Sequence, residues 1–156
     1  MIQRIQTFFL FLAGVISGSG IFLDWVNVFS RTQRFVLNFN GFFLENTQPP
    51  HLQSHTWGAT VFAAAAPLLA FAAIFFFKNR KLQSGICTLA IILIVCFYIT
   101  LGCYLYVAMQ KYTDCPCDIA PAVPAFFSLV ALILIALAKK FIKKDEKKVR
   151  AWERIR

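Results

Sequence analysis

The residues best suited to redox or metal chemistry are two cysteines separated by one proline, Cys115 and Cys117. Such neighbouring thiols can form a strained, reducible disulfide, or one of them can pair with another cysteine such as Cys103. Two thiolates also suit a soft metal such as Cu(I). A plain structural disulfide or an unused thiol pair is the simpler interpretation, so these cysteines alone do not indicate a redox protein.

A second pair of candidate ligands is His51 and His55, which would share one face if the segment between them were helical. Two histidines are half of a metal site, and no nearby cysteine or carboxylate completes a set of three or four ligands. We therefore interpret them as hydrogen-bonded surface groups, and we expect neither a bound metal nor a cofactor.

The elements that would position these residues are predicted from composition and hydropathy. Of the 156 residues, 59% are hydrophobic, whereas a soluble domain usually carries about 45–50%. Four long apolar stretches cover about 5–23, 57–77, 86–108 and 119–138. Because about 20 apolar residues in a helix cross a bilayer, we expect a single all-α membrane domain, an antiparallel bundle of four transmembrane helices.

Lysine and arginine are concentrated on one side of the predicted spans. The less basic side carries Arg31, Arg34 and Lys111. The basic side carries Arg4, Lys78, Arg80, Lys81 and the cations that follow the fourth span. Because basic loops stay in the cytoplasm, we expect a multi-pass membrane protein with both termini cytoplasmic. The net charge of +9 is then a topology signal, and no nucleic-acid partner is expected.

Small residues predict how the first two spans pack. Gly14 and Gly18 form a GxxxG motif in the first span. Five alanines of the second span repeat at spacings of three and four, which places them on one helical face. These alanines are Ala59, Ala63, Ala66, Ala70 and Ala73. We favour a packing seam within the chain over a dimerisation face.

The loop 24–56, on the less basic side, is too long and too aromatic for a simple connector. Within it, Asn40-Gly41 separates the apolar runs 35–39 and 42–44. Asn-Gly between apolar runs predicts a short β-hairpin whose two turn residues both have positive φ. The hairpin would cover the ends of the helices or meet a partner.

Catalysis and transport lack their usual sequence signatures. The chain has no GxSxG, HExxH, P-loop or GxGxxG motif, and its spans contain no acidic or basic side chain. A thiol oxidoreductase that passes electrons to quinone would need a cysteine pair in each outer loop, and the loop 24–56 has none. We expect no enzyme and no catalytic residue.

The segment 139–156 is predicted to be a basic cytoplasmic tail. In helical form it would place Ile142, Val149 and Trp152 on one side, turned toward lipid headgroups. Anionic lipid attracts each nearby cation with about 1 kcal/mol. The same charge would attract a partner protein or ribosomal RNA, but we favour lipid contact. The predicted contact residues are Lys139, Lys140, Lys143, Lys144, Lys147, Lys148, Arg150 and Trp152.

Three stretches together resemble a known family: the opening MIQRIQT, FKNRKLQ after the second span, and KKDEKKVR continuing to a final RIR. In this order, between four apolar spans, they resemble a bacterial family of small membrane proteins catalogued as a domain of unknown function. The resemblance implies a four-helix protein of the cytoplasmic membrane and transfers no functional residue.

The sequence therefore favours a non-catalytic accessory or assembly subunit of a larger membrane complex, with membrane lipids and a membrane protein as partners. Two alternatives remain open. One is a stand-alone thiol-redox or metal-linked membrane protein that uses Cys115 and Cys117, and the other is a lipid-binding four-helix protein.

Overall fold

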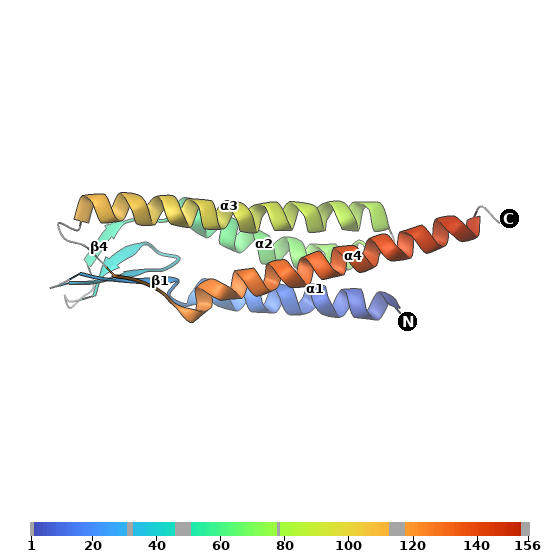
Figure 1. Ribbon diagram of the computed structural model, residues 1–156, viewed down its shortest axis with the longest axis horizontal. Coiled ribbons are helices and arrows are strands. Elements are labelled where there is room, and N and C mark those ends of the chain that lie inside the picture. Colours follow the sequence, from blue (N-terminus) through green and yellow to red (C-terminus); the bar gives the residue numbers. More distant parts are fainter. Residues whose placement is uncertain (1, 31–32, 46–50, 78, 113–117, 154–156) are drawn as a thin grey trace.

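The structure is a computed structural model that describes residues 2–30, 33–45, 51–77, 79–112 and 118–153. These residues form an elongated bundle of four helices with a β-sheet at one end (Figure 1). The helices are α1 (Ile2–Ser19), α2 (Trp57–Phe75), α3 (Arg80–Tyr112) and α4 (Phe127–Glu153). All four are long and apolar enough to cross a membrane, which confirms the four predicted apolar helices.

The predicted all-α class is confirmed only in part: the described residues are mostly helical, but a five-stranded antiparallel sheet extends beyond the single hairpin that was expected. Its strands are β1 (Val26–Phe29), β2 (Arg34–Leu37), β3 (Phe42–Leu44), β4 (His51–Ser54) and β5 (Asp118–Pro121). The strand order is β4-β3-β2-β1-β5, so the sheet combines four strands of the loop 24–56 with one strand that follows α3.

Strand β5 also corrects the predicted fourth span, which included Ile119. Ile119 pairs with Val28, and Pro121 pairs with Val26. A 3-10 turn, η2 (Val123–Phe126), then leads directly into α4. The apolar run 119–138 is thus shared between a strand, a turn and a helix, because β1 offers the first residues a row of backbone hydrogen-bonding groups.

The predicted hairpin is present, since β2 and β3 pair antiparallel on either side of Asn40-Gly41. Its turn differs from the prediction, because Leu37 pairs with Phe42 and no described residue other than glycine has positive φ. The Oδ1 atom of Asn38 accepts the N–H groups of Asn40 at 3.1 Å and Gly41 at 3.3 Å. This side chain replaces the two-residue turn with a four-residue loop.

Helix α3 is much longer than its predicted span 86–108, and its extra length supports the sheet. With a rise of 1.5 Å per residue, its 33 residues extend about 50 Å, against about 28 Å for α2. The N–H of Gly58 donates to the hydroxyl of Tyr104 at 3.3 Å. The start of α2 is therefore level with Tyr104, and α3 continues beyond it alongside the sheet (Figure 1).

Two apolar clusters hold the molecule together. The first joins the four helices and includes Leu10, Ala70, Ile94 and Ile135. The second joins the sheet to α2 and α3, and includes Trp25, Val28, Phe35, Phe42, Phe97 and Leu101. The half-buried ring of Tyr98 packs against both clusters, so the sheet and the bundle are one continuous structure.

The predicted seam of small residues is confirmed within the chain, since all five alanines of the α2 face are buried. A β-carbon built on Gly14 would lie 2.8 Å from the Cζ atom of Phe71, whereas one on Gly18 would lie 3.8 Å from the Cβ of Pro67. Of these two glycines, Gly14 is therefore the one in the tighter contact with α2.

Candidate functional site

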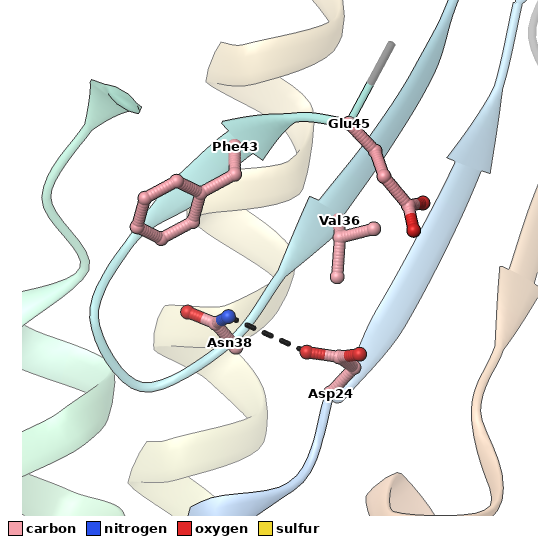
Figure 2. Close-up of a pocket in the computed structure, with 5 residues that line it drawn as sticks. All are labelled: Asp24, Val36, Asn38, Phe43 and Glu45. Atoms are coloured by element: carbon pink, nitrogen blue, oxygen red, sulfur yellow. Dashed lines mark hydrogen bonds between the residues drawn. The ribbon is translucent and has the colours of Figure 1, made fainter. Parts of the chain in front are cut away.

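The two faces of the sheet differ because side chains alternate along a strand. In β2, Phe35 and Leu37 are buried in the cluster beneath the sheet. Arg34, Val36 and the following Asn38 therefore point to the opposite face, away from the helices. A pocket of about 260 Å³ lies on that face (Figure 2).

The pocket combines carboxylates, an amide and apolar groups. It is lined by Asp24, Val36, Asn38, Phe43 and Glu45. Figure 2 shows Asp24 and Glu45 at opposite ends, with Val36 between them and α3 behind the sheet. Val36 and Phe43 are register partners on adjacent strands, so their side chains form one apolar floor.

Hydrogen bonds and an ion pair position the polar groups of the pocket. The Nδ2 atom of Asn38 donates to Asp24 Oδ1 at 3.3 Å. The Asn38 Oδ1 atom accepts the N–H groups of Asn40 and Gly41, which fixes the orientation of the amide. The Nε atom of Arg34 forms an ion pair with Glu45 Oε2 at 3.0 Å, and the Arg34 guanidinium lies 5.4 Å from the ring centre of Phe29.

These interactions leave acceptor capacity in the pocket. Each carboxylate uses one oxygen in the contacts just described, and within the described residues the second oxygens, Asp24 Oδ2 and Glu45 Oε1, have no partner. Two carboxylates and one guanidinium leave the pocket with one excess negative charge. The arrangement can therefore accept hydrogen bonds from a small cation.

The sequence prediction missed this pocket entirely. The signal that was available is the alternation over 34–38, in which Arg34, Val36 and Asn38 alternate with Phe35 and Leu37. That pattern predicts a strand with one buried face, but it does not indicate that Asp24 and Glu45 line one pocket on the other face.

The two histidines do not form the arrangement that a metal site would have required. His51 is the first residue of β4, where it pairs with Leu44, and His55 follows the strand, so the two do not share a helical face. Both side chains are exposed, and the His55 ring lies 6.1 Å from that of Trp57. Pairing of this segment with β3 excludes the helix that the metal hypothesis required.

The candidate dithiol cannot be placed, because Cys115 and Cys117 lie outside the described residues. Cys103 is exposed on α3, while Cys87 is buried in the bundle. Across the described ranges, no group of three histidine, cysteine or acidic residues is arranged to hold a metal ion. The predictions of a disulfide with Cys103 and of Cu(I) binding stay predictions.

The predicted basic tail is a continuation of α4 and packs partly against α1. Ile142 is fully buried, and the Phe141 ring stacks on Phe9 with centroids 5.9 Å apart. The prediction that Ile142 faces headgroups is therefore wrong, because α1 covers it. Lys139 is half-buried, and the exposed cations of this segment are Lys140, Lys143, Lys144 and Lys147. The side chains of Lys148, Arg150 and Trp152 lie outside the described set.

A known protein family matches almost the whole chain. A family described as "Domain of unknown function (DUF4293)" matches residues 2–155, which include every helix and strand. The chain belongs to this family. The resemblance noted in the sequence is thus confirmed, and both the sheet pocket and the lysines of α4 lie inside the DUF4293 domain. No curated protein matches the chain.

Proposed function

We propose that this chain is an integral protein of the bacterial cytoplasmic membrane and serves as a non-catalytic accessory or assembly subunit of a larger membrane complex. The supporting observation is that folded surfaces lie at both ends of the apolar bundle. The sheet extends along α3 at one end, and the lysine-bearing end of α4 projects past the bundle at the other (Figure 1). Surfaces on both sides of a bilayer suit a protein that joins other components.

Membrane insertion is supported by the large apolar side chains that each helix leaves uncovered by the protein. Examples are Phe8 of α1, Leu68 of α2, Ile92 of α3 and Ile133 of α4. In water these side chains would form an extended apolar surface, which soluble proteins avoid, whereas lipid would cover them.

The proposed orientation follows the distribution of charge. Arg80 and Lys81 begin α3 at the same end of the bundle as the exposed lysines of α4. Placing that end in the cytoplasm satisfies the positive-inside rule and puts the sheet, with Asp24 and Glu45, on the outer side.

The test is to purify the chain at its native level in mild detergent and quantify what accompanies it by mass spectrometry. Photo-crosslinkers at Phe43 and at Lys147 would trap a partner at either folded surface. A crosslinker at lipid-facing Ile92 is the matched control. A stoichiometric partner trapped at Phe43 or Lys147, and not at Ile92, supports an accessory subunit. A homogeneous chain with no stoichiometric partner would overturn the proposal.

A further inference from the structure

We propose that the pocket on the outward face of the sheet binds a primary ammonium group carried on a short alkyl chain. The pocket contains a negatively charged acceptor, an amide that positions it and an apolar floor. These features are contributed by Asp24, by Asn38, and by Val36 with Phe43. The inference does not depend on the accessory role, because it concerns one cavity and one class of ligand.

The charge balance of the pocket indicates a monovalent cation. Glu45 is compensated by Arg34 at 3.0 Å, whereas the neighbour of Asp24 is the neutral amide of Asn38. Asp24 therefore carries the excess negative charge, and its Oδ2 atom is the acceptor with which an ammonium would pair. A charge-assisted hydrogen bond of this kind is stronger than one between neutral groups.

The shape of the pocket indicates an ammonium and not a metal ion or a guanidinium. About 260 Å³ is far more than a bare ion needs, and Val36 and Phe43 offer an alkyl chain an apolar surface. A planar guanidinium fork prefers both oxygens of one carboxylate, and one oxygen of each carboxylate here is already engaged, Asp24 Oδ1 by Asn38 and Glu45 Oε2 by Arg34 (Figure 2). A primary ammonium has three donors directed from one point and needs no such pairing.

Two sources could supply this group at the position of the pocket. Asp24 directly follows Phe22 and Leu23, two exposed apolar residues at the end of the 3-10 turn that continues from α1. The Asp24 end of the pocket therefore adjoins exposed apolar surface. At this position the ligand is either the ammonium of a phosphatidylethanolamine headgroup or that of a lysine side chain of a neighbouring protein.

The experiment uses the full chain in nanodiscs of phosphatidylcholine, a lipid without a primary amine. n-Butylammonium is titrated in while the methyl resonances of Val36 and the side-chain amide resonance of Asn38 are recorded, with 1-butanol as the neutral probe. We expect saturable shifts with butylammonium and none with butanol. Asp24→Asn, which keeps an oxygen for Asn38, should weaken binding about fivefold, as expected for loss of one partly exposed charge pair.

Asp118→Asn is the matched control, because Asp118 is an exposed carboxylate of the same sheet that does not line the pocket. It should leave butylammonium binding unchanged. Absence of saturable shifts, an equal response to butanol, or equal weakening by Asp118→Asn and Asp24→Asn would each overturn the proposal. An unchanged spread of resonances elsewhere in the Asp24→Asn spectrum establishes that the variant is folded.

The two sources are separated in a second arm. In this arm, butylammonium is titrated into nanodiscs that contain phosphatidylethanolamine. If the lipid competes with butylammonium, and Asp24→Asn abolishes this competition, the pocket is assigned to the lipid headgroup. If that lipid does not compete but a lysine-containing peptide does, and its acetyl-lysine form does not, the ammonium comes from a protein. If neither competes with butylammonium, the assignment to a primary ammonium from these sources is wrong.

Discussion

The side-chain amide of Gln6 donates a hydrogen bond to the carboxylate of Asp145 at 2.5 Å, and both side chains are buried. Gln6 lies near the start of α1, and Asp145 lies near the end of α4. The bond therefore fastens the two ends of the described chain to each other. It also explains why an acidic residue within a lysine-rich segment faces the bundle: α1 supplies the donor that a buried carboxylate requires.

Gln6→Ala is expected to destabilise the protein by about 1–3 kcal/mol, because it leaves the Asp145 carboxylate buried without its donor. Lys144→Ala, at the exposed neighbouring position, should change stability by less than about 0.5 kcal/mol. Thermal unfolding in detergent measures both variants. Equal midpoints for the two would show that the Gln6–Asp145 bond contributes nothing.

Gly41→Ala is expected to destabilise the hairpin by about 1–3 kcal/mol, the usual cost of overpacking. A β-carbon at this position would lie 2.5 Å from the Ser54 carbonyl oxygen and from Leu52, and the backbone φ is +158°. The control is Gly85→Ala in α3, where nothing lies within 4 Å and where alanine favours the helix. Denaturant or thermal unfolding should separate the two variants, and a Gly41→Ala protein as stable as Gly85→Ala would contradict the prediction.

Trp25→Ala is expected to cost about 3–5 kcal/mol, as for other buried aromatic truncations. The Trp25 indole N–H donates to the Gly20 carbonyl at 2.9 Å, and its ring packs edge-on to Phe97 at 5.1 Å. Trp57→Ala is the matched control, since Trp57 is 71% exposed. Removal of Trp25 should also abolish the blue-shifted component of the tryptophan fluorescence. Similar unfolding midpoints for the two variants would argue against a sheet anchored through Trp25.

The proposed orientation predicts thiol labelling from opposite sides of the membrane. In a chain whose native cysteines are replaced by alanine, Asn40→Cys in the hairpin loop should react with an impermeant maleimide in intact spheroplasts. Lys147→Cys should react only after lysis, and Ile92→Cys should react in neither case, because lipid suppresses formation of the thiolate. Labelling of Lys147→Cys in intact spheroplasts would reverse the proposed orientation.

The helices could be predicted from the sequence because each one is specified by its own residues. A run of about 20 apolar residues, such as that starting at Trp57, predicts a span without any knowledge of its neighbours. The alanine face of α2 could be predicted for the same reason, since helical periodicity determines which residues share a face. The Asn40-Gly41 hairpin also depends on residues that are adjacent in the chain.

The rest of the sheet depends on partners distant in sequence. Strand β5 has four residues and continues into an apolar run, so hydropathy assigned Ile119 to a helix, whereas its pairing with Val28 makes it a strand. The hairpin turn changed for a similar reason: Thr60 donates to the Phe39 carbonyl at 2.6 Å and Thr56 donates to that of Asn38 at 3.0 Å. These bonds from the start of α2 hold the loop in a form that local turn chemistry does not predict.

The candidate pocket was beyond prediction because its residues belong to separate elements. Asp24 precedes β1, Asn38 follows β2 and Glu45 follows β3, so their proximity exists only once three strands are in register. The Gln6–Asp145 hydrogen bond likewise joins two residues that are far apart in the sequence. In both cases the sequence reveals the polar groups but not the pairing between them.

The position of β1 between β2 and β5 in the sheet has a consequence for biosynthesis. Four of the five strands leave the ribosome before α2, but β5, which pairs with β1, follows only after α2 and α3 have both been made. Until then one edge of β1 presents its backbone groups to solvent, an exposed template for pairing with another chain. Closing this long sequence separation is a late and slow step, so the nascent protein is most vulnerable to misassembly between translation of β1 and translation of β5.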